Sequence, residues 1–214
     1  MKKNVLISLL LLVIFTIPTV KATTTTILVY GDSLSANYGI PIEAGWVSLL
    51  AQRLKSQYTD YQIVNASISG ETTLGGRHRI DQSLATHNPD IIIIELGAND
   101  GLRGTSIQSI YDNLATIIRK SRQNNVNVLL VGMRLPPNYG ATYTAKFQGI
   151  FTQLAKEYPV AFAPFLFEGF AENSDFFLSD RLHPNEMAQP KILETIWQAL
   201  KPMLEKNKKE NTIK

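Results

Sequence analysis

Short apolar runs alternate with amphipathic segments along most of the chain. Runs rich in Val, Ile and Leu that are bounded by polar or turn residues are typical of buried β-strands. The run at residues 91–94 is isoleucine throughout, without alternation, which is typical of a strand covered on both faces in a parallel sheet. The pattern predicts five strands, at residues 26–30, 62–66, 91–94, 126–131 and 160–165.

The segments between these strands carry apolar residues at helical spacing. Within residues 106–124, apolar residues recur about every three to four positions and define one helix face. The pattern predicts five helices, at residues 43–58, 72–87, 106–124, 143–158 and 186–204, the last interrupted early by Pro190. Strands that alternate with helices predict a three-layer α/β/α fold with a five-stranded parallel sheet, and we expect the flavodoxin-like strand order 2-1-3-4-5.

Residues 1–22 have the composition of a secretory signal peptide. Lys2 and Lys3 form a positive start, and residues 5–17 are an uncharged, mostly apolar run that is short for a membrane span. Val20-Lys21-Ala22 resembles a small-x-small cleavage site, so we expect cleavage after Ala22 and export. An uncleaved N-terminal anchor is the alternative, because Lys21 is unusual beside a cleavage site.

The rest of the chain has the composition of one globular domain, residues 23–204, followed by a polar tail, residues 205–214, that we expect to fray. Of the 214 residues, 44% are hydrophobic and 18% are charged. The chain has no cysteine, which excludes a disulfide framework, a thiolate nucleophile and cysteine-ligated zinc. The formal net charge of +3 comes from the lysines of residues 1–22, so nothing indicates a nucleic-acid partner.

Polar and glycine-containing stretches follow the predicted strands. Gly31-Asp32-Ser33 follows the first strand, Gly70 the second and Gly97-Ala98-Asn99-Asp100 the third, while Asp180 and His183 follow the fifth. In a sheet of this kind, ligands bind beyond the carboxyl ends of the strands, where the strand order reverses. We therefore expect the functional site at this edge.

Ser33 and His183 are candidates for a nucleophile and its base. A serine hydroxyl is a poor nucleophile until a neighbouring base takes its proton. Asp180 precedes His183 by three residues, close enough in a tight turn to hold Nδ1–H and leave Nε2 facing a serine. We expect His78, which lies between two arginines, on the surface, and His87 at a helix end with a structural role.

An ester hydrolase also needs hydrogen-bond donors for the oxyanion. The candidates are the Ser33 N–H, the Gly70 N–H and the Asn99 side-chain amide. Each feature has a plainer interpretation on its own: a helix cap at Ser33, a turn at Gly70 or Asn99, and a helix-entry cap at Asp180. Together these interpretations require all the residues to meet at one sheet edge by accident, so we favour a serine hydrolase.

Four blocks of the sequence resemble those of the SGNH (GDSL) hydrolase family, in order. The blocks are Gly31-Asp32-Ser33-Leu34, Gly70 with residues 65–69, Gly97-Ala98-Asn99-Asp100, and Asp180 with His183. Longer stretches, at residues 64–72, 95–104, 134–140 and 183–185, are similar to the periplasmic thioesterase I/lysophospholipase L1/protease I group of that family. The resemblance covers residues 27–204, and ordered blocks in one α/β frame carry more weight than any single motif.

The resemblance implies roles for the matched residues and a location in the periplasm. The implied catalytic residues are Ser33, Asp180 and His183, and the implied oxyanion hole is Ser33, Gly70 and Asn99. Asp32 and Asp100 would be supporting residues, and the implied substrate-binding residues are Leu102, Arg103, Leu135 and Pro136.

Two positions depart from the family pattern. Asn37 stands where relatives often have glycine, and we expect the turn to survive because asparagine tolerates a left-handed conformation. Thr105 replaces a bulkier residue near the acyl groove, which leaves the acyl chain-length preference open.

The predicted activity is hydrolysis of carboxylic esters and thioesters through an acyl-enzyme, as an arylesterase, acyl-CoA thioesterase or lysophospholipase. We expect no metal or other cofactor, a small-molecule ester or lysophospholipid as substrate, no stable membrane insertion after processing, and a monomer. A carbohydrate O-acetylesterase of the same fold, a flavodoxin-like binding domain and an inactive protein of this fold are the alternatives. The absence of Gly-x-Gly-x-x-Gly and the negative charge of Asp32 disfavour an anion-binding loop at Gly31-Asp32-Ser33.

Overall fold

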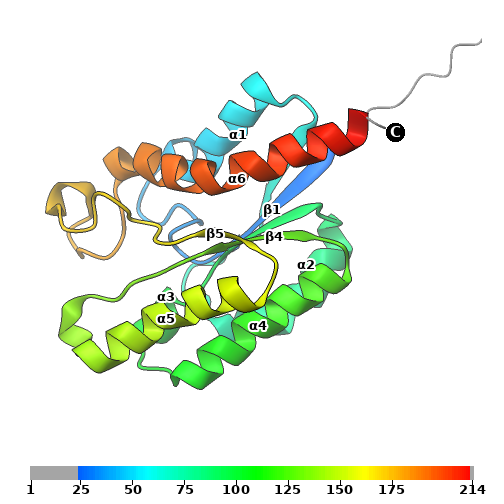
Figure 1. The fold of residues 1–214 in the computed structure, drawn as a ribbon. Helices are drawn as coiled ribbons and strands as arrows, with labels where there is room; N and C mark the ends of the chain where they lie inside the picture. The colour runs from blue at the N-terminus through cyan, green and yellow to red at the C-terminus, as the bar shows by residue number, and fades with distance from the viewer. Residues whose placement is uncertain (1–23, 213–214) are drawn as a thin grey trace, which may run out of the picture.

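The computed structural model describes residues 24–212, with side chains through residue 206. The predicted signal peptide, residues 1–22, lies outside the described residues. A β-sheet forms the middle layer of the molecule and helices cover both of its faces, as Figure 1 shows. None of the helices between residues 24 and 212 combines the length and apolar composition that a membrane crossing requires.

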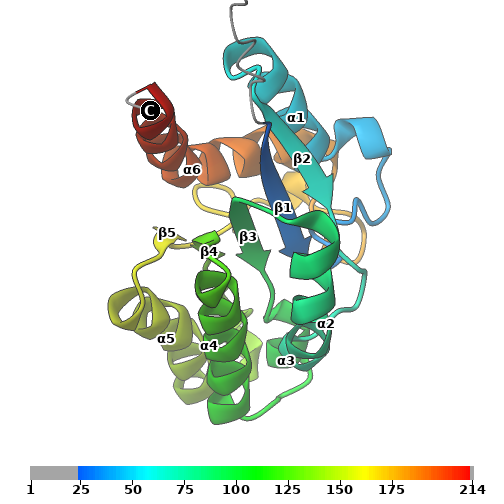
Figure 2. The same cartoon turned by 90° about the vertical axis from the view of Figure 1, so that its right-hand side faces the viewer.

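The sheet of the described residues is parallel throughout, and its strand order is β2-β1-β3-β4-β5 (Figure 2). This arrangement confirms the predicted fold class and strand order. The strands are β1 (Thr25–Gly31), β2 (Tyr61–Asn65), β3 (Ile91–Glu95), β4 (Asn127–Val131) and β5 (Ala161–Ala163).

Two groups of helices sandwich the sheet. On one face, α1 (Trp46–Gln57) packs against α6 (Gln189–Thr212). On the other face, α4 (Ile107–Gln123) packs between α2 (Thr73–His87) and α5 (Ala141–Glu157). The short helix α3 (Ala98–Leu102) follows β3 directly. Single 3₁₀ turns lie at Ile42–Ala44, Pro137–Tyr139, Ser174–Phe176 and Glu186–Ala188.

The hydrophobic core explains why β1 and β3 occupy the middle of the sheet. Every residue of both strands is buried, and the four isoleucines of β3 have no exposed surface. Apolar side chains on both faces of a strand are buried only where helices cover both faces of the sheet. The uninterrupted isoleucine run therefore places β3 at the centre, next to β1.

Helix α1 begins at Trp46 instead of the predicted residue 43, and three further differences from the predicted elements have identifiable reasons. Strand β5 ends at Ala163, because Pro164 has no N–H to donate to a further ladder bond. Residues 98–102, expected in a loop, form α3, which is too short to show a helical period. Helix α6 begins at Gln189 and continues to Thr212, past the predicted end at residue 204, and Pro190 lies in its first turn, where the missing N–H has no intrahelical partner to lose.

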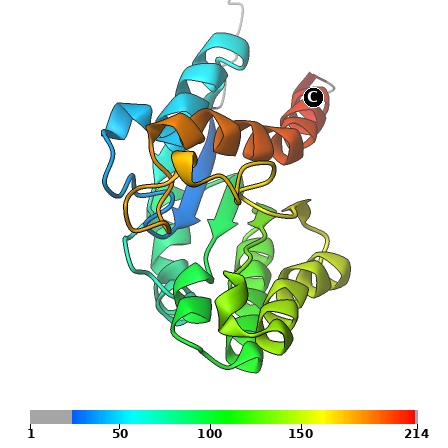
Figure 3. The same cartoon turned by 90° about the vertical axis from the view of Figure 1, so that its left-hand side faces the viewer.

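The loops that leave the carboxyl ends of β1, β3 and β5 gather at one edge of the sheet. Figure 3 views the molecule from this side, where the segment after β1 lies beside the segment that precedes α6. Since the strands are parallel, residues far apart in the sequence meet at this edge.

Candidate active site

The segment after β1 presents Ser33 at the tip of a tight turn. Gly31 is the last residue of the strand, and the carbonyl of Asp32 accepts hydrogen bonds from the N–H groups of Ser35 (3.3 Å) and Ala36 (2.9 Å). The side chain of Ser33 is half-buried at the mouth of a cavity. Asn37 adopts a φ of 59°, so the left-handed turn expected there is present.

The Ser33 hydroxyl, the His183 ring and the Asp180 carboxylate form a continuous chain of hydrogen bonds. Ser33 Oγ lies 2.9 Å from His183 Nε2, and His183 Nδ1 lies 2.7 Å from Asp180 Oδ2. The turn that holds them is local, since Asp180 Oδ1 accepts the N–H groups of Leu182 (2.9 Å) and His183 (3.0 Å). Arg181, between them, has a φ of 58°.

The environment of Asp180 favours its charged form. Burial alone would raise the pKa of this carboxyl, but hydrogen bonds from the backbone N–H groups of His183 and Leu182 and from the His183 ring outweigh it. The pKa of Asp180 is therefore held below its ordinary value. A carboxylate at this position keeps the proton of the imidazole on Nδ1 and leaves Nε2 to accept the proton of Ser33.

The other two histidines lie away from Ser33. His78 is exposed on α2, as the sequence predicted, and His87 is the last residue of that helix. Only His183 of the described histidines contacts the serine.

The Ser33 N–H, the Gly70 N–H and the Asn99 amide each keep a hydrogen that no described protein group accepts; Ser33 and Asn99 line the same cavity, whereas Gly70 is not among its lining residues. Among the described residues, the N–H groups of Ser33 and Gly70 donate to no protein acceptor. Gly70 has a φ of +79°, a conformation that favours glycine. The Asn99 amide carries two hydrogens, and it donates one to Asp32 Oδ2 at 2.9 Å, which leaves the second for a ligand.

The carboxyl of Asp32 fixes the orientation of Asn99. Its Oδ1 accepts the N–H of Leu34 at 3.0 Å, while its Oδ2 accepts the Asn99 amide, so both oxygens act as acceptors. Burial raises the pKa of Asp32 to about 6, against the lowering effects of the bonds from Leu34 and Asn99. Asp32 contacts neither the base nor the nucleophile through its side chain, which fits a supporting position.

Asp100 joins the Asn99 turn to the start of α2. Its buried carboxylate accepts the Thr73 N–H at 2.8 Å and the Thr73 hydroxyl at 2.6 Å, and Asn113 donates to the same hydroxyl. Thr73 follows the Gly70 turn by three residues. The hydrogen bonds between Thr73 and Asp100 therefore connect the segment that follows Gly70 with the helix that carries Asn99.

A cavity of about 500 Å³ opens in front of Ser33 and Asn99. Its walls are mainly apolar, and they come from the segments after β1, β3, β4 and β5. The lining includes Ser33, Asn99, Leu102, Met133, Leu135, Pro136, Phe165, Phe167, Phe177, Leu182 and His183. Leu102, Leu135 and Pro136, for which the resemblance implies substrate binding, are among these lining residues.

Arg103, for which the resemblance implies a substrate-binding role, is not among the residues that line this cavity. Its side chain is exposed, and Nη2 donates to the carbonyl of Gly70 at 3.3 Å. Arg103 is the C-cap of α3, and its side chain reaches the Gly70 turn.

Sequence reasoning missed the aromatic wall and one ring contact. Phe165, Phe167 and Phe177 lie in the long connection between β5 and α6, and all three line the cavity. Phenylalanines in a loop at the carboxyl edge were the available signal. Tyr38 was also missed: its ring packs on His183 with centroids 4.2 Å apart, a contact that no motif predicted.

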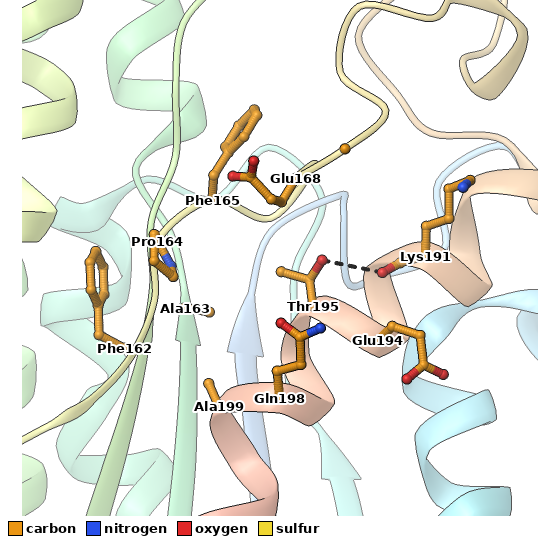
Figure 4. Close-up of a pocket in the computed structure, with 11 residues that line it drawn as sticks. Phe162, Ala163, Pro164, Phe165, Glu168, Lys191, Glu194, Thr195, Gln198 and Ala199 are labelled. Atoms are coloured by element: carbon orange, nitrogen blue, oxygen red, sulfur yellow. Dashed lines mark hydrogen bonds between the residues drawn. The ribbon is translucent and has the colours of Figure 1, made fainter.

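A second cavity, of about 580 Å³, lies between α6 and the segment around β5 (Figure 4). The Thr195 hydroxyl there donates to the carbonyl of Lys191 at 3.2 Å, an ordinary bond within a helix. The lining contains no member of the Ser33, His183 and Asp180 chain. Size alone therefore does not identify the site, and the chemistry lies in the smaller cavity.

Comparison with known proteins supports the same conclusion. The profile of the GDSL-like lipase/acylhydrolase family matches residues 29–189. Esterase TesA of Pseudomonas aeruginosa is 43% identical over 186 residues, which cover 87% of this chain and 92% of the relative. Thioesterase 1/protease 1/lysophospholipase L1 of Escherichia coli is 38% identical over 179 residues, covering 84% of this chain and 85% of the relative.

A solved structure agrees with these sequence matches. The psychrotrophic esterase EstA from Pseudoalteromonas sp. superposes with a TM-score of 0.80 at 40% identity, over 85% of this chain and 99% of that one. The chain therefore belongs to the GDSL-like lipase/acylhydrolase family and is an ester-hydrolysing enzyme.

Proposed function

We propose that the enzyme hydrolyses carboxylic esters and thioesters through an acyl-enzyme formed on Ser33. The observation that carries this proposal is the unbroken chain from Ser33 Oγ to His183 Nε2 (2.9 Å) and from His183 Nδ1 to Asp180 Oδ2 (2.7 Å). This arrangement supplies a nucleophile, a base and a group that orients the base.

The first half-reaction uses each of these atoms. Ser33 Oγ bonds to the carbonyl carbon while its proton moves to His183 Nε2, and the carbonyl electron pair shifts onto oxygen. The oxyanion accepts hydrogen bonds from the Ser33 N–H, the Gly70 N–H and the free hydrogen of the Asn99 amide. Collapse of this intermediate expels the alcohol or thiol, which takes the proton from His183. Water then releases the acid by the same steps, with His183 again the base.

Ser33→Ala and His183→Ala are each expected to remove nearly all ester hydrolysis, and the double variant is expected to be no worse than either one. The reason is that nucleophile and base act as one unit, so removing either ends the proton transfer. The measurement is kcat/KM on p-nitrophenyl esters for the three variants. Losses that multiply in the double variant would contradict a Ser33–His183 pair.

Asn99→Ala is expected to lower kcat by roughly 10²- to 10³-fold, because one of three oxyanion donors is lost while nucleophile and base remain. Thermal unfolding confirms that the variant is folded. Asn127→Ala, an exposed asparagine at the start of β4, is the matched control and should leave kcat unchanged. An Asn99→Ala enzyme with the rate of the wild type removes Asn99 from the oxyanion hole.

The apolar walls of the cavity support an acyl chain, rather than a sugar, as the group that fills it. Leu102, Leu135 and Phe167 offer contact area but few hydrogen-bonding groups, whereas a bound sugar needs several. We therefore propose medium- or long-chain acyl esters, including lysophospholipids, as the substrate class. The name of the Escherichia coli relative includes a lysophospholipase activity, which supports this class.

Hydrolysis of p-nitrophenyl esters should rise from acetate toward medium or long acyl chains, because each added CH₂ buries apolar surface against these walls. The series is measured on residues 23–214, with Ser33→Ala as the background. Activity confined to acetate would favour the carbohydrate O-acetylesterase alternative. Ester binding without Ser33-dependent turnover would favour a binding protein.

We also propose export to the periplasm, with residues 1–22 removed and residues 23–204 forming the enzyme domain as a monomer. The basic start and the uncharged apolar run of residues 1–22 support this proposal. The mass of the protein released from the periplasm of an expressing Gram-negative cell should correspond to a chain that begins at Thr23. A mass that includes residues 1–22, with the protein retained on membranes, would indicate an anchor.

A further inference from the structure

The carboxyl of Glu95 is enclosed beneath the nucleophile turn, and the mechanism above does not use it. Glu95 is the last residue of β3, pairs in register with Gly31 of β1, and has no exposed surface. Its Oε2 accepts the Ser35 hydroxyl at 2.7 Å and the Asp32 N–H at 3.3 Å. Its Oε1 is buried and has no hydrogen-bond partner among the described residues.

The structure around this carboxyl leaves no spare room. A Cβ atom at Gly31 would lie 2.6 Å from Glu95 Oε2 and 2.8 Å from Ser35 Oγ, distances that real Cβ atoms do not show. Glycine at position 31 therefore allows the Glu95 carboxyl to lie close to the backbone of β1. The strand end and the turn after it are shaped to admit the Glu95 side chain.

Glu95 lies beside a second buried carboxyl, that of Asp32, and neither forms an ion pair with a described lysine, arginine or histidine. The charged group that acts on Glu95 is Asp32, which repels its charged form; Asp32 is in turn attracted by His183 and repelled by Asp100. Two buried carboxylates without a cation between them are costly to ionise together. One of the two therefore holds a proton.

Hydrogen-bond geometry decides which carboxyl holds it. Both oxygens of Asp32 accept N–H groups, from Leu34 and Asn99, so a proton on either would replace a bond. Glu95 receives both of its donors on Oε2 and leaves Oε1 free to carry hydrogen. Burial, and then the charge of Asp32, raise the pKa of Glu95 well above its ordinary value, in agreement with this assignment.

We propose that Glu95 is a positioning residue for the oxyanion hole, acting as a neutral acid whose Oε2 holds the Asp32 N–H and the Ser35 hydroxyl. Through these bonds it fixes the turn that carries Ser33. It also lets Asp32 remain the single acceptor that aims the Asn99 amide. This inference rests on the proposed catalytic roles of Ser33 and Asn99.

Glu95→Gln and Glu95→Ala test the proposal in activity. Glutamine keeps a carbonyl oxygen for both donors and carries hydrogen on the other atom, so kcat should stay within a few-fold of wild type. Alanine leaves both donors unpaired, and kcat should fall about 10- to 100-fold with KM little changed. If Glu95→Ala does not fold, Ser35→Ala, which removes one of the two bonds, takes its place and should lower kcat in the same direction.

The protonation state of Glu95 can also be tested through the pH dependence of thermal stability. The folded state raises the pKa of Glu95, so this side chain ionises at a lower pH in the unfolded chain than in the folded one. The free energy of unfolding of the wild type therefore falls as the pH rises above 4.5, the ordinary pKa of a glutamate. Glutamine cannot ionise. The Tm of Glu95→Gln minus that of wild type should therefore increase between about pH 5 and pH 8. Glu43→Gln, at an exposed glutamate, is the control and should show a constant difference.

Two results would overturn the proposal: a Glu95→Gln enzyme as slow as Glu95→Ala, or a Tm difference that stays flat or shrinks as the pH rises. Both are distinct from failure of the proposed function. That failure would appear as ester hydrolysis that persists in Ser33→Ala, whereas the Tm comparison does not depend on catalysis.

Discussion

The hydrogen bond between the Ser33 hydroxyl and the His183 ring joins residues 150 positions apart in the chain. In the proposed mechanism each residue depends on the other, because a serine hydroxyl is a poor nucleophile until a neighbouring base takes its proton. The parallel sheet is what brings them together, because it delivers the carboxyl ends of β1 and β5 to one edge. The buried isoleucines of β3 hold the centre of that sheet, so the position of the nucleophile depends on a core that contains no catalytic group.

Three carboxyl side chains near Ser33, those of Asp180, Asp32 and Glu95, have different pKa values because their surroundings differ. Asp180 is partly exposed and receives several donors, so its pKa is low and it remains a charged partner for His183. Asp32 is buried with one donor on each oxygen, and its pKa rises to about 6. Glu95 is enclosed beside Asp32 with both donors on one oxygen. Burial and the hydrogen-bond partners of each oxygen thus give these three carboxyl groups different pKa values within one small region.

Much of the fold could be predicted from the sequence, because the information was local. Four consecutive isoleucines identify a covered strand, and the spacing of apolar residues in 106–124 identifies α4. Single residues set the ends of two elements. Pro164 ends β5, and Ser106 caps the start of α4 by accepting the Ser109 N–H. Helix α3 escaped prediction because five residues give no period, and α6 ran beyond the predicted end because its Lys- and Glu-rich sequence is compatible with a helix.

The site divides into a part that motifs reveal and a part that they do not. Ser33, Gly70, Asn99, Asp180 and His183 stand in short blocks whose chemistry is legible at fixed spacing. Glu95 could not be recognised, because a glutamate at the end of a strand is ordinarily exposed. Its burial depends on the missing side chain of Gly31 and on the Ser35 hydroxyl, both in a segment distant in sequence.

The walls of the cavity show the same limit. Phe167 and Phe177 line the cavity from a connection that contains only single 3₁₀ turns, so no periodic pattern marks which of its side chains face inward. Of the residues in the proposed mechanism, Ser33 lies on the turn that follows β1, Asn99 lies on the short helix α3, and Asp180 and His183 lie on a turn closed by its own hydrogen bonds. Ser33 thus lies on a different segment from the aromatic wall, whereas Asp180 and His183 share the connection between β5 and α6 with Phe165, Phe167 and Phe177. The base of the proposed mechanism and the wall that would hold the acyl group are therefore coupled through one stretch of chain.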